Sequence, residues 1–535
     1  MVQATVVNQR DTPFFNELIL GHLEGNPKVQ SFAGEKITTE NLLAKVAAKK
    51  ANYKVDRSIL ASIFQSQIDR FGAHPLQQKN IDFLKEENTF CFTTAHQINL
   101  FTGPLYCIYK ALHAVKLAEE ANAVSSDYNF VPVFWMHTED HDIDEIDHFY
   151  LFGEKQQWDH NYVGASGDLD SNSLGHLIEK ITAELGDSEF ARNTVELLRK
   201  HFLQDRNYGT SAAAFLNELF AEKGLLVLDQ HDERLKALAT DLFHAEIFDS
   251  FVKKGVEESN AALEAHNFPV QAYPRDINLF FLEGSQRYRI EKSKDDSEKW
   301  ELVGSDRVFT TACFEKELKE NSIAFSPNVL CRPLFQETVL PNLAYIGGGG
   351  ELAYWMQLKS TFQHRGLTYP ALQLRNTFVW IDEANQKKMG KLNIDFSKFW
   401  QQEDALVKNF IVDNFGEDLQ LADEKAKIEA IFEGIIAKMK ATDPSLEAAG
   451  EGEKKRQLKS LDNLESKMLR AEKRKHQTSS TRLRSVKSSL FPGKSLQERR
   501  DNVVEYLAKY GLEFIEDIYQ HSTGFKTSFT VLKES

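Results

Sequence analysis

The chain has 535 residues, a formal net charge of −15 and an apolar fraction of 42%. A chain this long exceeds one ordinary hydrophobic core, so we expect at least two structural units. The acidic balance argues against general affinity for nucleic acid, and no apolar run approaches the roughly 20 residues that cross a bilayer.

The N-terminal segment and the cysteines indicate the compartment. Residues 1–15, MVQATVVNQRDTPFF, lack the basic segment and apolar stretch of a secretory signal, so we expect a cytoplasmic protein. The four cysteines form no C-x-x-C pair, which argues against a structural zinc knuckle or a thioredoxin-type site.

Short apolar runs that end in polar or glycine-rich turns predict the strands of a parallel sheet. These runs lack polar alternation, which is typical of strands buried on both faces. A strand, a helix and a second strand over 89–136 form one βαβ unit, and repetition of this order predicts a doubly wound α/β core. The predicted strands are 89–94, 129–136, 224–229, 278–283, 342–347 and 370–374.

Two stretches interrupt this rhythm within a predicted catalytic core of residues 1–380. Residues 155–222 are polar and helical, and we expect an insertion over the sheet. Residues 284–318 carry many charges and predict a hairpin excursion.

The pattern from 381 to 521 is almost entirely helical, and a short tail, 522–535, follows it. A turn near Pro444 separates two long helical patterns, which predicts an antiparallel coiled coil. Such an arm commonly pairs two subunits, so we expect a homodimer, with packing inside one chain as the alternative. The predicted apolar stripes are Ile428, Ile431, Ile435 and Met439 on the first helix, and Leu458, Leu461, Leu464, Met468 and Ala471 on the second.

The second part of this helical region is basic. Residues 453–500 contain 15 Lys or Arg against 5 Asp or Glu. A solvated helix face is the simplest interpretation, and a phosphorylated ligand or the acidic surface of a partner subunit is the alternative. RNA is less favoured, because no aromatic residues interleave the basic ones.

A first cluster of candidate site residues follows the strand at 89–94. Gln97 and Asn99 lie in the loop, and Thr102-Gly103-Pro104 is predicted to start the next helix with Thr102 as its cap. A helix N-terminus favours a phosphate or a carboxylate, although an ordinary helix start is the alternative. The helix then adds two side chains near the carboxyl edge of the sheet, those of Tyr106 and Lys110.

A second cluster, HTEDHDIDEIDH, occupies residues 137–148 after a strongly apolar strand. Such a density of acids and histidines requires a metal, an amino group or several hydrogen-bond donors. Recognition of a substrate amine or hydroxyls with acid/base work is favoured, whereas metal binding and a solvated loop are alternatives; no H-E-x-x-H motif is present. The candidates are His137 and Glu139 for binding, and Asp140, His141 and Asp142 for catalysis.

A third cluster is a strand, four glycines and a helix within residues 344–359. Consecutive glycines can form a concave nest of N–H groups around a phosphate, but Glu351 in the first helical turn would repel one. We therefore expect Glu351 to face a ribose hydroxyl or a substrate amine, with a tight packing turn as the alternative. The binding candidates are Gly347, Gly348, Gly349, Gly350, Glu351, Tyr354 and Trp355.

Basic and amide side chains beside two apolar runs complete the candidates. Arginines in such places often hold an acidic ligand, although surface pairs are equally common. The residues are Arg275, Asn278, Arg289 and Arg332.

Four blocks of sequence carry a resemblance to a known family. They are 94–110, 131–148, 326–355 and 490–511, and they occur in family order over about residues 10 to 520. The chain resembles the bacillithiol biosynthesis cysteine-adding enzymes, the BshC family. It departs from the family pattern at Ala95-His96 and at Gly349, where the family usually has Gly-Gln and Pro; His96 becomes an extra acid/base candidate.

The resemblance implies a Rossmann-like core with insertions and a coiled coil that pairs two subunits. It implies a ligase that joins the carboxyl group of cysteine to the amine of glucosaminyl-malate. By analogy with class I aminoacyl-tRNA synthetases it implies ATP with Mg²⁺, cysteinyl-adenylate formation and a nucleotide near Thr102-Gly103-Pro104. In that scheme a carboxylate or histidine of 137–142 takes the amine proton, and Lys110 or helix N–H groups stabilise the oxyanion.

Two other functions remain open from the residues. One is a nucleotidyltransferase-like carboxylate–amine ligase of a different pathway. The other is a non-catalytic coiled-coil scaffold, which would need no polar cleft.

Overall fold

The computed structural model describes residues 2–162, 164–284, 286–296, 298–415 and 421–535. The chain divides into two compact units. Residues 2–379 and 496–532 form the larger unit, and residues 380–495 and 533–535 form the smaller one. The contacts thus group 496–521 with the larger unit, whereas the sequence pattern assigned them to the helical region.

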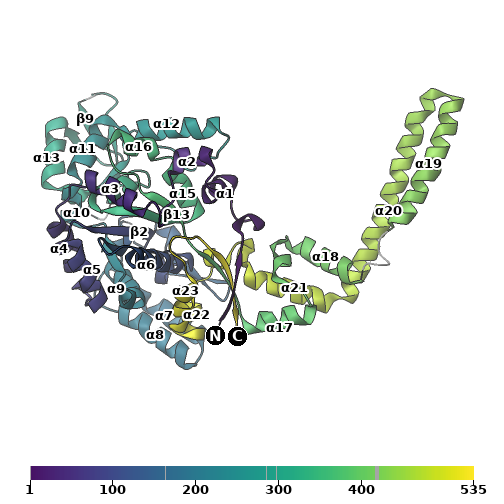
Figure 1. Ribbon diagram of the computed structural model, residues 1–535, viewed down its shortest axis with the longest axis horizontal. Coiled ribbons are helices and arrows are strands. Elements are labelled where there is room, and N and C mark those ends of the chain that lie inside the picture. The colour runs from purple at the N-terminus through teal and green to yellow at the C-terminus, as the bar shows by residue number, and fades with distance from the viewer. Residues whose placement is uncertain (1, 163, 285, 297, 416–420) are drawn as a thin grey trace. The chain divides into compact units, whose positions relative to one another are not determined.

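The larger unit is built on a five-stranded parallel sheet of order β13-β12-β2-β3-β6 (Figure 1). Five of the six predicted strands form this sheet, which confirms the predicted Rossmann-like core. The chain reverses its direction of winding between β2 and β12, and ligands bind at such a switch point in open α/β sheets. The strands are β2 (Thr89–Gln97), β3 (Asn129–His137), β6 (Leu226–Asp229), β12 (Asn342–Gly347) and β13 (Ala371–Leu374).

Continuous apolar sequence explains why these strands are central. Every residue of β12 is buried, and β3 exposes only its two ends in part. Pro132 lies inside β3 although proline cannot donate a ladder hydrogen bond. It is tolerated because β6 begins to pair with β3 only at Val133, one residue later.

The sixth predicted strand, β7 (Leu279–Glu283), is a strand but belongs to a second sheet of order β10-β9-β8-β7-β11. The pairings in this second sheet are antiparallel, and the sheet includes the predicted charged hairpin. This inserted sheet brings side chains to the carboxyl edge of the central sheet. Its other strands are β8 (Gln286–Lys292), β9 (Lys299–Leu302), β10 (Val308–Thr310) and β11 (Phe325–Pro327).

Helices cover both faces of the central sheet, and the polar stretch at 155–222 is mostly helical (Figure 1). The helices before residue 130 are α1 (Glu17–Glu24), α2 (Pro27–Ala33), α3 (Leu42–Asn52), α4 (Arg57–Ile68), α5 (Pro75–Leu84) and α6 (Tyr106–Val124). Those that follow are α7 (Gly175–Leu185), α8 (Glu189–Phe202), α9 (Tyr208–Phe220), α10 (Glu233–Leu238), α11 (Thr240–Asp249), α12 (Phe251–Ala265), α13 (Thr311–Glu320), α14 (Arg332–Val339), α15 (Gly349–Met356), α16 (Lys359–His364), α22 (Val503–Tyr510) and α23 (Glu513–His521). Two short strands, β4 (His148–Leu151) and β5 (Glu154–Gln157), pair with each other. A further sheet of order β1-β15-β14 is formed by β1 (Val2–Val7), β15 (Phe529–Glu534) and β14 (Thr377–Ile381).

Helix α6 is buried on more faces than its pattern predicts. The spacing of apolar residues leaves Lys110 and His113 off the apolar stripe, yet both side chains are fully buried. Lys110 is covered by α15, where Glu351 contacts its ammonium. The C-terminal segment covers His113, whose Nε2 atom lies 2.8 Å from the carbonyl oxygen of Gly524. Local periodicity cannot reveal a cover that arrives four hundred residues later.

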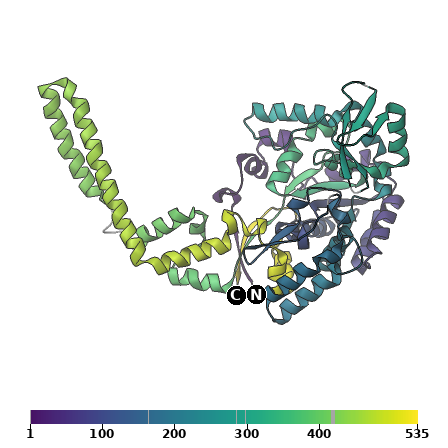
Figure 2. The same cartoon turned by 180° about the vertical axis from the view of Figure 1, so that it is seen from behind.

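The smaller unit is helical, and α19 and α20 run side by side in opposite directions (Figures 1 and 2). This confirms the predicted antiparallel coiled coil. Among the described helices of the whole chain, none is long and apolar enough to cross a membrane. The helices of this unit are α17 (Glu383–Leu392), α18 (Glu403–Phe415), α19 (Ala422–Thr442), α20 (Glu447–Lys475) and α21 (Gln477–Leu490).

The predicted apolar stripe of α19 does not face α20 in its central turns. Ile431 and Ile435 are 60% and 42% exposed, whereas Ile436 is buried. Gly450 on α20 permits this close approach, because a Cβ there would lie 2.7 Å from Cγ1 of Ile436. On α20, Leu464 is 46% exposed, and the neighbouring Glu465 forms a 2.6 Å ion pair with Lys425 of α19 instead.

Candidate functional site

A cavity of about 710 Å³ lies at the carboxyl ends of β2, β3 and β12, inside the larger unit. This volume falls within the usual range of small-molecule sites. Five arginines and four carboxylates line it, so it can bind a ligand that carries both anionic groups and an amine. The lining side chains include Gln97, Tyr106, His137, Asp140, His141, Asp142, Glu145, Arg275, Arg287, Asn328, Arg332, Glu351, Tyr354, Arg375 and Arg499.

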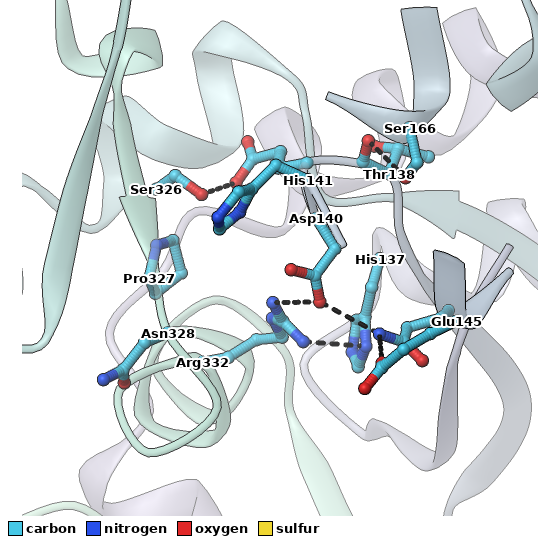
Figure 3. Close-up of polar contacts among 12 residues, drawn as sticks. His137, Thr138, Asp140, His141, Glu145, Ser166, Ser326, Pro327, Asn328 and Arg332 are labelled. Atoms are coloured by element: carbon cyan, nitrogen blue, oxygen red, sulfur yellow. Dashed lines mark hydrogen bonds and ion pairs between the residues drawn. The ribbon is translucent and has the colours of Figure 1, made fainter. Parts of the chain in front are cut away.

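Arg332, at the first turn of α14, joins two of the predicted residues (Figure 3). Its Nη1 donates to Nδ1 of His137 at 3.0 Å, and its Nη2 lies 3.7 Å from Oδ2 of Asp140. Its Nε is buried without a hydrogen-bond partner among the described residues. A buried donor without a partner is costly, so this N–H is a candidate contact for an anionic ligand.

The Asp140 carboxylate lies between two arginines of the cavity, Arg332 and Arg287. Its Oδ1 accepts from Nη1 of Arg287 at 3.2 Å, and its Oδ2 accepts from Nε2 of Gln97 at 3.1 Å. Burial raises the pKa of Asp140, but Arg332 and Arg287 outweigh it and hold the pKa below the ordinary value. Asp140 is therefore a charged, weakly basic carboxylate.

Two histidines of the cavity are fixed as neutral rings. Nδ1 of His141 lies 3.2 Å from Nη1 of Arg287, and Nδ1 of His137 contacts Arg332 in the same way. Arginine can only donate, so each Nδ1 accepts and each neutral ring carries its proton on Nε2. Burial, followed by the facing arginine, lowers the pKa of both rings, that of His137 most. Neither ring is free to take a proton while its arginine stays in place.

Lys110 does not face the cavity. Its ammonium donates to the carbonyl oxygen of Ala95 and to both oxygens of Glu351, at 2.7 and 3.0 Å. A lysine has three donors, and these contacts occupy them. The structure thus leaves Lys110 no donor for a substrate oxyanion, and it links β2, α6 and α15 instead.

The four glycines do not form a phosphate nest. None of Gly347–Gly350 has a left-handed φ angle, which an alternating nest requires. The Oε2 atom of Glu351 accepts from the backbone N–H of Gly348 at 2.8 Å, so the start of α15 is closed by its own carboxylate. Gly348, Gly350, Glu351 and Tyr354 nevertheless line the cavity, whereas Gly347 and Gly349 are not among its lining residues.

Helix α6 begins at Tyr106, three residues later than predicted, and its N-cap position is Leu105 instead of Thr102. Phe101 and Thr102 have left-handed φ angles of 50° and 73°, and the buried Thr102 hydroxyl has no hydrogen-bond partner among the described residues. The side-chain N–H₂ of Asn502 donates to the carbonyl oxygens of Leu100, Phe101 and Gly103, at 2.8–3.3 Å. The C-terminal segment therefore shapes the loop that the sequence assigned to a phosphate-facing helix start.

Gly103 and Asn99 stabilise the conformation of this loop. Gly103 has a φ of 69°, and a Cβ on it would lie 2.5 Å from Cβ of Asn99. Asn99 donates to the carbonyl oxygen of Glu145 at 3.1 Å. Neither residue is among those that line the cavity.

Asp501, which precedes Asn502 in the sequence, makes the free energy of unfolding depend on pH. Burial, together with the nearby Glu505 carboxylate, raises the pKa of Asp501 from 3.8 to about 7. Between these values the unfolded chain binds fewer protons than the folded chain, so stability falls as the pH rises from about 4 to 7. Replacing Asp501 with Asn should remove the contribution of this residue and so raise the free energy of unfolding by about 4 kcal/mol more at pH 8 than at pH 4. The buried Glu246, whose pKa is also raised to about 7, keeps its own contribution.

Urea unfolding at a series of pH values measures this effect. The exposed Asp404 provides the control, and its replacement with Asn should leave the pH profile unchanged. A D501N variant that retains the fall of wild type between pH 4 and 7 would contradict the prediction.

Four further predicted residues lie outside the cavity lining. Glu139 is buried behind it, and Asn278 is buried and donates to Glu246 at 2.8 Å. Arg289 is exposed and pairs with Glu291 at 3.4 Å. Trp355 belongs to the core, where it stacks on Tyr345 with ring centroids 4.2 Å apart.

Family models match nearly the whole chain. Residues 2–376 match the family described as "Bacillithiol biosynthesis BshC, N-terminal Rossmann-like domain". Residues 378–534 match "Bacillithiol biosynthesis BshC, C-terminal coiled-coil domain". The chain belongs to the BshC family.

Curated relatives and solved structures complete the comparison of this BshC-family chain. It is 35% identical to "Putative cysteine ligase BshC" of Flavobacterium psychrophilum, over 99% of both chains. It is 32% identical to the protein of the same name of Flavobacterium johnsoniae, over 98% of this chain and 99% of that one. A putative arginyl-tRNA synthetase structure from Campylobacter jejuni is 9% identical, with 82% and 94% of the two chains covered and a TM-score of 0.23, which carries no inference about activity.

Several cavity residues of this BshC-family chain were missed from its sequence as binding residues. Arg375 follows β13 directly, and its guanidinium donates to both oxygens of Glu498 at 2.7 and 2.6 Å while its Nε is buried without a partner among the described residues. A polar residue just after a predicted strand was the available signal. Arg287, on β8, and Arg499, in the C-terminal segment, gave no such signal.

His96, proposed only as an extra acid/base candidate, also lines the cavity. Burial, with the Lys110 charge next in size, lowers its pKa to about 3, so the ring is neutral near pH 7. Its buried Nε2 has no hydrogen-bond partner among the described residues. In the described part of the chain no group of three or more His, Cys, Asp and Glu side chains is arranged to hold a metal ion.

Proposed function

We propose that this chain is a ligase that joins the carboxyl group of cysteine to the amine of glucosaminyl-malate, which forms the amide of bacillithiol. One observation carries the proposal. Arg332 and Arg375 line one cavity, and each has a buried Nε–H without a partner among the described residues. Charge-assisted hydrogen bonds to carboxylate or phosphate are the strong contacts that such donors make. The names of the curated relatives support the same activity.

The two malate carboxylates would meet the arginines on one side of the cavity. Arg332 is fixed by His137 and Asp140, so its Nε–H is already oriented. Arg275 lines the same cavity and is exposed, so it can move to meet a second carboxylate. An oriented donor loses little conformational freedom on binding, which favours a specific contact.

ATP is the co-substrate that the family resemblance implies, and the residues present fit an anionic group of that kind. Arg375, fixed by Glu498, and the exposed Arg499 both line the cavity and would hold phosphate oxygens. When bound, ATP would supply activation of the cysteine carboxyl group. Mg²⁺ would arrive with the nucleotide.

The amine of glucosaminyl-malate must be neutral when it attacks, so a nearby group has to hold its proton. Two arginines lower the pKa of Asp140 and so make it a weak base, and His141 is fixed by Arg287. Asp142 and Glu145 line the cavity without a bond to an arginine among the described contacts. We assign the amine and its proton to this pair, and we assign the orientation of the arginines to Asp140.

Deletion of the gene, followed by thiol profiling of cell extracts, tests the proposal. The deletion strain is expected to lack bacillithiol and to accumulate glucosaminyl-malate, and the wild-type gene should restore the thiol. A deletion strain with normal bacillithiol would contradict the proposed substrate and favour a different carboxylate–amine ligase.

A further inference from the structure

A buried polar cluster lies directly behind the cavity, and its centre is Glu139. This carboxylate is 1% exposed and follows β3 by two residues. Nζ of Lys236 lies 2.6 Å from it, Nδ1 of His231 lies 2.8 Å from it, and the hydroxyl of Ser326 donates to it at 2.7 Å. Burial opposes ionisation, but Lys236 and His231 hold the pKa of Glu139 far below its ordinary value.

Ser326 connects this carboxylate to the cavity. It lies on β11 of the inserted sheet, and its Oγ accepts from Nε of Arg287 at 3.2 Å. The direction of both bonds is fixed, because a carboxylate only accepts and a guanidinium only donates. The single hydroxyl proton therefore points at Glu139, and an oxygen lone pair faces Arg287.

Arg287 connects Ser326 to two side chains of the cavity. Its Nη2 donates to the carbonyl oxygen of Pro327 at 3.2 Å, and its Nη1 contacts Oδ1 of Asp140 and Nδ1 of His141. The guanidinium also lies 4.0 Å from the ring centroid of Phe280. With these contacts the planar group has one orientation, and that orientation sets the positions of two cavity side chains.

We propose that Glu139 and Ser326 are positioning residues, which orient Arg287 and through it the Asp140–His141 loop. Glu139 does not contact the ligand; it anchors the inserted sheet to the end of β3. The substrates concerned are those of the proposed function, on which the catalytic consequence rests. The orientation itself is a property of the free protein.

Replacing Ser326 with Ala removes the hydroxyl that links Glu139 to Arg287, and it leaves no new buried charge. His141 faces Arg287, Asp140, Asp142 and the ring of Phe280, so its titration reports whether Arg287 has moved. Once Arg287 moves away from Nδ1, the ring accepts a proton more readily, so its titration midpoint should rise by roughly half a pH unit. Histidine labelled with ¹³C at Cε1 gives this midpoint by NMR, and the H141Q variant identifies the resonance.

Two further variants make the test decisive. Ser326→Cys fills the site with a slightly larger thiol that accepts poorly, so it should shift the midpoint in the same direction if the S326A protein does not fold. Ser171→Ala is the matched control, because this fully buried hydroxyl donates to the carbonyl oxygen of Phe202, away from Arg287. Its midpoint should equal that of wild type.

Turnover supplies the second readout. S326A should lower kcat about tenfold, and it should cause no further loss in the R287K background, because residues that act through one another are not additive. A His141 midpoint in S326A and S326C equal to that of S171A would overturn the positioning role. A wild-type protein that forms no amide would instead overturn the proposed function, while the titration still decides the role of Ser326.

Discussion

Replacing Arg332 with Gln is expected to lower kcat/KM about 100- to 1000-fold, which corresponds to about 3–4 kcal/mol of transition-state stabilisation. The side chain is 9% exposed and contacts His137 and Asp140. Glutamine removes the free Nε–H, the charge and the hold on both neighbours at once. We expect KM for the dicarboxylate substrate to rise and kcat to fall, because the lost contacts both bind the ligand and organise the site.

Arg289 is the matched control for this substitution. It is an arginine of the same cavity-proximal region, but it is 44% exposed, pairs with Glu291 and does not line the cavity. Arg289→Gln should therefore keep kcat/KM within about twofold of wild type, as is typical of an exposed pair. Equal losses in the two variants, or an unimpaired R332Q, would contradict the assignment of Arg332.

Replacing Lys110 with Met should produce the largest loss of stability. The ammonium is fully buried and contacts Glu351 at 2.7 Å. Removing one partner of a buried ion pair leaves the other charge uncompensated, which costs about 3–5 kcal/mol. The remaining donors to Glu351, the hydroxyl of Tyr345 at 2.9 Å and the N–H of Gly348, offset part of that cost.

Urea unfolding of the full chain measures the effect, and Lys116 supplies the control on the same helix. Lys116 pairs with Glu119, whose side chain is 54% exposed. Lys116→Met should cost only about 1–2 kcal/mol, since the partly exposed pair contributes little and the contact of Nζ with the Tyr519 ring, 3.8 Å away, adds about 1 kcal/mol. If K110M unfolds at the urea concentration of wild type, Lys110 is not the structural link between α6 and α15 that its contacts indicate.

The central sheet was predictable because burial on both faces leaves a strong pattern. Runs such as 129–136 contain almost no polar residues, and only a strand between two helical layers tolerates such a run. The strand at 278–283 has the same local character but pairs in the inserted sheet. A single run of six residues does not encode its partner, so its assignment to the parallel sheet was wrong.

The polar residues that follow the strands were predictable as a group, because the carboxyl edge of a parallel sheet collects them. Their individual positions were not. Lys110 and Glu351 satisfy each other, an outcome that depends on how α6 and α15 approach in space. Arg287 and Arg289 lie two residues apart on β8, and only the docking of the inserted sheet decides which of them meets Asp140.

The coiled coil shows the same limit, because the sequence did not predict which apolar residues of α19 face α20. Ile431 and Ile435 have the spacing of a packing stripe, yet the seam passes through Ile436. A nearby glycine and an ion pair, Gly450 against Ile436 and Lys425 with Glu465, set the rotation of the two helices. Whether this arm pairs two subunits stays a prediction, and the mass of the protein in solution would measure it.

The most direct test of the account is incubation of the purified protein with cysteine, glucosaminyl-malate and ATP-Mg²⁺. Mass spectrometry would follow bacillithiol and the nucleotide products, with each component omitted in turn. We predict bacillithiol and AMP in the complete mixture, and neither product when cysteine is omitted. A complete mixture that forms no bacillithiol would contradict the assignment of this cavity to amide formation.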